Sequence, residues 1–229
     1  MKTLGLVGGT GWVSTVDYYR LINQEANRRL GGLNFCEMFI YSFNYAEINS
    51  RNKKDDHAAI FGMVKQAAQK LITAGAEGIV LCANTLHMYA DDLQKEIDVP
   101  IIHIAEATAK EINSRNFSKA GLMGTKFTME KDFYKTRLSN HGITPLVPEA
   151  EDREFINDTI FNELLKEIFK KETKEKFLEI IDKLKTRGAE TIILGCTEIP
   201  LLIKEGDCDL PIINTLEIHS KAAVDFALS

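Results

Sequence analysis

The sequence predicts an α/β protein made of two similar lobes, each a mostly parallel sheet flanked by helices. Two observations lead to this fold class. Short apolar runs alternate with longer amphipathic runs along the 229 residues, which is typical of parallel strands joined by covering helices. In addition, the order of glycine turns, buried strands and polar loops in the first half of the chain returns in the second half.

Short runs rich in Ile, Leu and Val indicate strands, because Gly, Pro or polar residues bound them. Strands are expected at residues 4–7, 37–43, 78–81, 101–104, 120–123, 191–194 and 212–214. The stretches between them carry apolar residues three and four positions apart, as amphipathic helices do. Helices are expected at residues 15–30, 57–74, 88–97, 105–115, 129–141, 152–170, 174–187 and 216–227. Gly75, Gly142 and Gly188 stand just past three of these helices, where a left-handed backbone favours glycine.

The internal repeat is clearest where residues 75–85 (GAEGIVLCANT) match residues 188–198 (GAETIILGCTE) without a gap. Each segment holds a helix end, a buried strand and a loop. The repeat extends in both directions: residues 5–8 resemble 121–124, and residues 98–102 resemble 209–213. We therefore expect one lobe from residues 1–103 with a returning segment 214–229, and a second lobe from residues 104–213.

Four loops follow expected strands, at residues 8–12, 82–85, 124–125 and 195–198. In open parallel sheets, ligands bind beyond the carboxyl ends of the strands. These loops are rich in glycine and hydroxyl side chains, which suit close backbone approach and hydrogen bonding to a small polar ligand. We expect the two lobes to face each other across one active site that takes a small carboxylate.

The composition excludes several classes of protein. The net charge of -5 argues against a general nucleic-acid binder, because phosphate binding needs clustered Lys and Arg. No apolar stretch approaches the roughly 18 residues of a membrane span, and the N-terminus shows no signal-peptide pattern. Four cysteines and five histidines lack the spacing of a zinc site or a disulfide framework. We therefore expect a cytoplasmic protein without metal, membrane or nucleic-acid partners.

Cys196 is the strongest catalytic candidate. It lies between Gly195 and Thr197 after a buried strand, and Pro200 suits the first turn of a following helix. A thiol at a helix N-terminus feels the positive end of the macrodipole, which lowers its pKa from about 8.5 towards neutrality and makes thiolate available as a base. The alternative is an inert core cysteine.

Other loop residues have two readings each. Glu198 is either a charge partner for a helix N-terminus or a ligand for a substrate ammonium group. Asn84 and Thr85 either cap a helix or bind a substrate carboxylate. The glycines at residues 8–14 suggest a nucleotide-binding loop, but Ser14 stands where that motif has its third glycine. We favour a turn that offers backbone N–H groups and the Thr10 hydroxyl to a substrate carboxylate. His219 is expected to be structural, and His87 is left open.

In this order, the segments 8–12 (GGTGW), 81–87 (LCANTLH), 121–125 (GLMGT) and 195–198 (GCTE) resemble the aspartate/glutamate racemase family, in its amino-acid racemase branch, over the whole chain. The resemblance implies an isomerase that uses neither pyridoxal phosphate nor a metal. In such an enzyme one cysteine removes the α-proton of aspartate or glutamate, and a second returns a proton from the opposite face.

The resemblance also implies roles for residues of this chain. Cys196 would be one acid-base group. The residues expected to bind substrate are Thr10, Asn84, Thr85, Thr125, Thr197 and Glu198, with Arg51, in the loop after the second strand, and Lys166 as cations for the distal carboxylate. The partner is then a small acidic amino acid, and a homodimer is the default assembly.

The first half of the chain departs from the family pattern. In the repeat, Cys196 aligns with Ala83, whereas Cys82 aligns with Gly195. Ala83 cannot transfer a proton, and Cys82 should point away from the active site because successive strand side chains alternate. A re-aimed Cys82, an ordered water, Thr85 or Thr10 would rescue the second face. Without rescue, a one-cysteine decarboxylase or lyase acting on a small dicarboxylate is the alternative, and a non-catalytic ligand- or nucleotide-binding protein is another.

Overall fold

The chain, described over residues 1–229 by a computed structural model, divides into two compact units. Unit 1 comprises Met1–Ile104 and His219–Ser229, and unit 2 comprises Ala105–Ile218. The second boundary lies inside the last helix rather than before residue 214. The start of this helix is held by unit 2, because the Thr215 hydroxyl donates a hydrogen bond to the Leu194 carbonyl at 2.8 Å.

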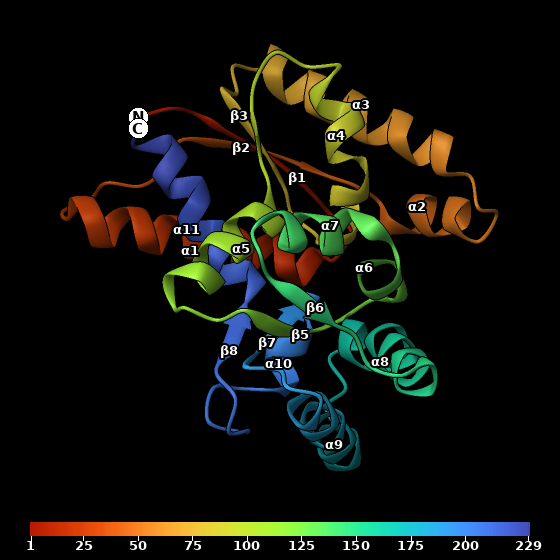
Figure 1. The fold of residues 1–229 in the computed structure, drawn as a ribbon. Helices are drawn as coiled ribbons and strands as arrows, with labels where there is room; N and C mark the ends of the chain where they lie inside the picture. Colours follow the sequence, from red (N-terminus) through yellow and green to blue (C-terminus); the bar gives the residue numbers. More distant parts are fainter. The chain divides into compact units, whose positions relative to one another are not determined.

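Unit 1 is built on a parallel sheet with the strand order β2-β1-β3-β4. Figure 1 labels β1, β2 and β3 of this sheet. Its strands are β1 (Leu4–Gly8), β2 (Met38–Ser42), β3 (Gly78–Leu81) and β4 (Ile101–Ile102). Its helices are α1 (Trp12–Leu30), α2 (Tyr45–Asn52), α3 (His57–Thr73), the 3-10 turn η1 (Thr85–Tyr89), α4 (Ala90–Gln94) and most of α11 (Thr215–Ala227). The central strands β1 and β3 are buried along their whole length, so the loops that follow them are anchored in the core.

Unit 2 repeats this plan with the strand order β6-β5-β7-β8, again parallel. Its strands are β5 (Lys119–Gly124), β6 (Thr144–Leu146), β7 (Thr191–Gly195) and β8 (Ile212–Asn214). Its helices are α5 (Ile104–Ser114), α6 (Lys126–Glu130), α7 (Asp132–Asn140), α8 (Ala150–Asn162), η2 (Leu164–Lys166), α9 (Lys171–Thr186) and α10 (Ile199–Leu202). The predicted fold class is confirmed, and β5 and β7 are the counterparts of β1 and β3.

Several elements differ from the sequence prediction. Strand β6 was not predicted because it is short and contains Pro145. An edge strand tolerates proline, because the backbone N–H groups on its outer side have no neighbouring strand to bond. The expected helix 129–141 is interrupted at Lys131, whose backbone is extended, and this residue separates α6 from α7. The expected helix 152–170 stops at Asn162, and Glu167 adopts a left-handed conformation before α9 begins. Helix α2 was also missed.

The predicted glycine stops are confirmed. Gly75, Gly142 and Gly188 have φ angles of +112°, +76° and +93°, which side chains rarely adopt, and each follows the end of a helix. Each of these turns is followed within three residues by a strand: β3 after Gly75, β6 after Gly142 and β7 after Gly188. None of the helices combines the length and the apolar composition needed to cross a membrane.

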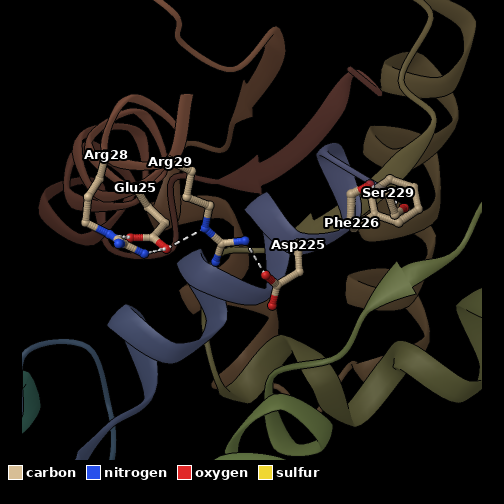
Figure 2. Close-up of polar contacts among 6 residues, drawn as sticks. All are labelled: Glu25, Arg28, Arg29, Asp225, Phe226 and Ser229. Carbon is tan, nitrogen blue, oxygen red and sulfur yellow. Dashed lines mark hydrogen bonds and ion pairs between the residues drawn. The ribbon is translucent and has the colours of Figure 1, made fainter. Parts of the chain in front are cut away.

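An ion-pair network attaches the C-terminal helix to α1 within unit 1 (Figure 2). The carboxylate of Glu25 accepts hydrogen bonds from Arg28 at 2.8 Å and from Arg29 at 2.7 Å. Arg29 also donates to Asp225 of α11, so one guanidinium joins the two helices. The hydrogen bond from Arg28, followed by the contacts with Arg29, lowers the pKa of buried Glu25 from 4.5 to about 2, against the effect of burial.

This network makes a prediction for acid stability. A carboxyl group whose pKa falls on folding stabilises the fold above its ordinary pKa, and the contribution is lost as the pH falls from 4.5 to about 2. We expect Glu25→Gln to reduce the free energy of unfolding by about 2 kcal/mol at neutral pH, and the difference from wild type to disappear near pH 2. Urea unfolding across this pH range measures both values.

The matched control is Glu111→Gln, which removes a half-exposed carboxylate of α5 that pairs with Arg115, four residues later and just past the end of the helix. Exposed pairs of this kind contribute only a few tenths of a kcal/mol, so this variant should stay close to wild type. Equal losses in the two variants would contradict a special role for Glu25.

Candidate active site

The glycine loop after β1 is shaped by contacts inside unit 1. Gly9 has a φ of +84°, and a Cβ there would lie 2.2 Å from the backbone nitrogen of Phe43, so no other residue fits. Its N–H donates to the Thr15 hydroxyl at 2.9 Å. The Gly8 carbonyl accepts from the Phe43 N–H at 3.0 Å. The Gly9 amide and the Gly8 carbonyl are therefore committed to the fold of this loop.

Thr10 is the residue of this loop that points to a ligand. Its hydroxyl oxygen is buried and has no hydrogen-bond partner in the structure. Leaving a buried hydroxyl without a partner costs on the order of 1–3 kcal/mol, and such groups are rare outside functional sites. A substrate oxygen or ammonium group would remove that cost, which supports the prediction that Thr10 binds substrate.

The loop after β3 is held by His87. The ring Nε2 accepts a hydrogen bond from the Ile104 N–H at 3.1 Å, because a backbone amide can only donate. The proton therefore sits on Nδ1, which donates to the Ala83 carbonyl at 2.9 Å. His87, left open by the sequence, is a positioning residue that fixes the backbone of Ala83. The two predicted substrate ligands that follow, Asn84 and Thr85, are buried and half-buried, and Asn84 does not cap η1.

A second histidine supports the same region. His219 is fully buried; its Nε2 donates to the Ile102 carbonyl at 2.6 Å, and its Nδ1 accepts from the Tyr18 hydroxyl at 2.7 Å. Burial, reinforced by nearby His87, lowers the pKa of His219 to about 3. The ring centroids of His219 and His87 lie 5.3 Å apart, and those of His87 and His103 lie 4.7 Å apart. His219 has the structural role expected of it.

Cys82 lies in the interior of unit 1. Its side chain is fully buried, and the thiol donates a weak hydrogen bond to the Val80 carbonyl, with a sulfur-to-oxygen distance of 3.7 Å. Burial raises its pKa far above the ordinary thiol range. A thiol in this state stays protonated at neutral pH, so these contacts give no support to Cys82 as the second acid-base group.

In unit 2, the loop after β5 begins helix α6. Thr125 is buried and stands at the N-cap of α6, where its hydroxyl accepts from the Thr128 N–H at 3.4 Å. The two threonine hydroxyls lie 3.2 Å apart. Gly124 and Gly195 pack closely, since a Cβ on Gly124 would lie 2.7 Å from the Gly195 carbonyl oxygen. The ends of β5 and β7 are therefore in contact, which brings Thr125 to the same sheet edge as Cys196.

Cys196 and Glu198 form a buried thiol–carboxylate pair directly after β7. The thiol donates to Oε2 of Glu198 at 2.9 Å, and the Thr197 hydroxyl donates to the same oxygen at 2.9 Å. All three side chains are buried. The following helix, α10, has four residues and Pro200 in its first turn, which fixes the exit of the chain after Glu198.

The expectation of a lowered pKa for Cys196 is wrong for this state of the protein. Burial raises the pKa well above the ordinary thiol value, and the negative charge and hydrogen-bond acceptance of Glu198 raise it further. Hydrogen bonds from the backbone amides of Glu198 and Thr197 oppose the shift only in part. The sequence argument considered the helix dipole and left out a buried carboxylate two residues away. The resting group is therefore the thiol.

The two predicted cations lie on helical elements. Arg51 belongs to α2 rather than to a loop, is half-buried, and donates from Nη1 to the Glu47 carbonyl one turn earlier at 3.0 Å. Lys166 ends η2 and is exposed. No group of three or more His, Cys, Asp or Glu side chains has an arrangement that could hold a metal ion.

Known proteins share the family and the fold of this chain. A model of the Asp/Glu/hydantoin racemase family matches residues 7–223. The chain belongs to this family. Over 232 residues it is 25% identical to the broad-specificity amino-acid racemase RacX of Bacillus subtilis, a match that covers 99% of this chain and 98% of RacX. The glutamate racemase of Aquifex pyrophilus is 36% identical over 141 residues, which cover 57% of this chain and 50% of that enzyme.

Solved structures give the same assignment. An aspartate racemase homologue from Pyrococcus horikoshii has 36% identity and a TM-score of 0.87, and each chain is covered completely. A protein from Yersinia pestis, described as a candidate Asp/Glu racemase, has 42% identity and a TM-score of 0.94, also over both whole chains. The family predicted from the glycine and cysteine loops is confirmed, and with it the enzyme class, an isomerase of the amino-acid racemase kind.

The thiol–carboxylate pair yields a prediction for Cys196 reactivity. Because Glu198 contributes to the raised thiol pKa, Glu198→Gln should lower that pKa and increase the thiolate fraction at any pH below it. We expect a several-fold faster alkylation of Cys196 by iodoacetamide near pH 8, with about tenfold for each pKa unit removed. Mass spectrometry of the peptide that contains Cys196 separates it from the other three cysteines.

The matched control is Thr197→Val, which removes the other hydrogen bond to Oε2 without changing the charge at position 198. It should alter the alkylation rate much less than Glu198→Gln does. An unchanged or slower rate in Glu198→Gln would show that the carboxylate does not govern the protonation of this thiol.

Proposed function

We propose that this protein is an amino-acid racemase that acts on aspartate or glutamate by thiol-based α-proton transfer, without a cofactor. The observation that carries the proposal is the buried contact of 2.9 Å between the Cys196 thiol and the Glu198 carboxylate. The relatives support the substrate class, because they include a broad-specificity amino-acid racemase, glutamate racemases and an aspartate racemase homologue. The chain spans about half the length of the glutamate racemases it matches, so their activity is not carried over directly.

The proton steps start from the protonated thiol. Glu198 accepts the thiol proton through the existing hydrogen bond, which leaves a thiolate on Cys196. The thiolate then removes the α-proton, so the sulfur becomes a thiol again and the electron pair stays on the substrate as a carbanion. A proton must next reach the α-carbon from the other face for inversion to occur. Oε1 of Glu198 would bind the substrate ammonium group.

The second proton donor is the weak part of this chemistry. Ala83 has no transferable proton, and Cys82 is fully buried inside unit 1, where its thiol donates to the Val80 carbonyl. We propose that the Thr10 hydroxyl, buried and without a partner, relays this proton: it gives its own proton to the carbanion and takes one from a water, and the hydroxide left behind is neutralised by the proton that Glu198 releases. A hydroxyl is a much weaker acid than a thiol, so the reaction should be slow from both enantiomers.

The remaining predicted ligands would hold the substrate carboxylates. Asn84, Thr85 and Thr125 offer amide and hydroxyl donors at the ends of β3 and β5, whereas Thr197, after β7, already donates its hydroxyl to Glu198 and would offer its oxygen as an acceptor. Arg51 is our first choice for the distal carboxylate, because it is half-buried and a guanidinium binds a carboxylate with two parallel hydrogen bonds. Lys166 is the second choice, because it is exposed.

A second candidate function is favoured by Ala83 itself. An enzyme with one working thiol can protonate a carbanion on one face only, as a decarboxylase or lyase of a small dicarboxylate does. Such an enzyme would release carbon dioxide or ammonia and would not interconvert enantiomers.

Proton exchange in deuterium oxide tests the proposed function. Proton NMR of L- and D-aspartate and L- and D-glutamate should show loss of the α-proton signal with the wild-type protein, together with chiral inversion from at least one enantiomer. Cys196→Ala should reduce both to background, because it removes the base. Full exchange in Cys196→Ala would overturn the proposal. Release of carbon dioxide or ammonia without inversion would instead establish the one-cysteine alternative.

The internal repeat predicts how to restore the second face. Position 83 aligns with Cys196, so Ala83→Cys should place a second thiol where the family has one. We expect kcat/KM for inversion to rise at least tenfold and equally from both enantiomers, because the two enantiomers are equally stable and their equilibrium constant is one. The matched control is Thr85→Ser, which keeps a hydroxyl in the same loop and adds no thiol. An Ala83→Cys variant that folds but exchanges no faster would argue against this register.

A further inference from the structure

The turn after α2 joins Arg51 to the start of α3. The Arg51 carbonyl accepts hydrogen bonds from the Lys54 N–H and from the Asp56 N–H, both at 3.0 Å. Asp56 is also the N-cap of α3, where its carboxylate accepts from the Ala59 N–H at 3.1 Å. The position of Arg51 is therefore coupled to the first turn of α3.

His57, the first residue of α3, makes two polar contacts through its ring. Its Nε2 lies 3.0 Å from Oδ1 of Asp55, and its Nδ1 lies 3.0 Å from the Tyr89 hydroxyl. A carboxylate can only accept a proton, so the proton of the neutral imidazole sits on Nε2, beside Asp55. Nδ1 is then the acceptor, and the Tyr89 hydroxyl donates to it.

Tyr89 is fixed by its surroundings as well as by this hydrogen bond. The residue is only 8% exposed. Burial, followed by the charge of Asp55, raises the pKa of Tyr89 to about 12, so the phenol keeps its proton at neutral pH. Phe61 follows His57 by one turn of α3 and packs on the Tyr89 ring, with 6.2 Å between the ring centroids.

This contact, called here the His57–Tyr89 bridge, links two elements that carry predicted substrate ligands. On one side, His57 begins the helix whose cap holds the Arg51 carbonyl. On the other side, Tyr89 ends η1, which begins at Thr85 directly after the loop of β3. All of these residues belong to unit 1. The bridge therefore connects Arg51 with the loop that offers Thr85 to a substrate.

The internal repeat indicates that packing alone does not require a hydroxyl at position 89. Thr85 aligns with Glu198, and counting on without a gap pairs Tyr89 with Leu202. Leu202 is buried in the core of unit 2, so an apolar side chain fills the equivalent position there. The hydroxyl of Tyr89 is thus a feature of unit 1, where it has a polar partner.

We propose that the His57–Tyr89 bridge positions Arg51 and thereby sets the affinity for amino acids with a second carboxylate. This inference rests on the proposed function, in which Arg51 binds the distal carboxylate. A guanidinium makes two parallel hydrogen bonds to a carboxylate in one orientation only, so a small displacement of its helix weakens the contact. His57 and Tyr89 act through Arg51 and are positioning residues.

Tyr89→Phe tests the proposal, because it removes the hydroxyl and keeps the ring that packs on Phe61. Isothermal titration calorimetry with the full-length protein measures binding without turnover. We expect the Kd of L-aspartate and of L-glutamate to rise about fivefold, as loss of one hydrogen bond predicts. His57→Gln, whose amide can replace Nε2 but not Nδ1, should give the same rise, and the double variant should be no worse than either single one.

The matched control is Tyr134→Phe. It removes an equally buried phenol hydroxyl, which donates to the Thr108 hydroxyl at 3.1 Å in unit 2. Both substitutions should lower the thermal stability, but only Tyr89→Phe should change the Kd. An Arg51→Gln background separates positioning from general loosening, because without the guanidinium Tyr89→Phe should have no further effect on the Kd.

Three outcomes would overturn the proposal: an unchanged Kd in Tyr89→Phe, an equal rise in Tyr134→Phe, or a rise that persists in the Arg51→Gln background. Circular dichroism checks folding, and His57→Gln gives the answer if Tyr89→Phe does not fold. Proton exchange, measured separately, tests the proposed function. Aspartate binding without α-proton exchange would refute racemisation and leave the positioning role intact. A wild-type chain that binds neither acidic amino acid would refute both.

Discussion

Parallel pairing of two central strands is the constraint on which both units depend. In unit 1, β1 pairs with β3 in register from Leu4 with Gly78 to Val7 with Leu81, and in unit 2, β5 pairs with β7 from Ala120 with Thr191 to Gly124 with Gly195. Parallel strands end at the same edge, so each pair delivers two loops side by side. The polar loops start where the buried strands stop, and every candidate acid-base residue lies in one of these loops.

The protonation of Cys196 follows from how its loop is packed. A thiol at the end of a fully buried strand is shielded from water, and the chain then turns so that Glu198 faces the sulfur. The carboxylate keeps the proton on sulfur in the resting protein, and a protonated thiol reacts more slowly with oxidants and electrophiles than a thiolate does. The Thr197 hydroxyl also donates to the Glu198 carboxylate, and this hydrogen bond lowers the free-energy cost of burying the negative charge.

The sequence was sufficient to predict the fold class because the relevant signals are local and repeated. Glycine stops, apolar strand runs and the eleven-residue repeat are each readable without contacts, and together they define both sheets. It was insufficient for β6 and α2, which are short and have mixed composition, so tertiary pairing rather than local preference decides them. Within the site, residue types were predictable, whereas the raised pKa of Cys196 and the hydrogen bonds of His87 depend on burial and on partners 2 and 17 residues away.

The repeat also shows that the two halves differ by more than one residue. Glu198 aligns with Thr85, so the loop of unit 1 lacks the carboxylate that accepts the thiol proton in unit 2. Unit 1 instead has His87, which donates to the Ala83 carbonyl and accepts from the Ile104 N–H, so it ties the loop to the start of α5. The first loop thus holds a hydrogen-bonded backbone, and the second holds a buried thiol–carboxylate pair. The two halves keep the common pairing of their central strands, while their loops carry different chemical groups. The absence of a thiol at position 83 therefore goes together with the absence of a carboxylate at position 85.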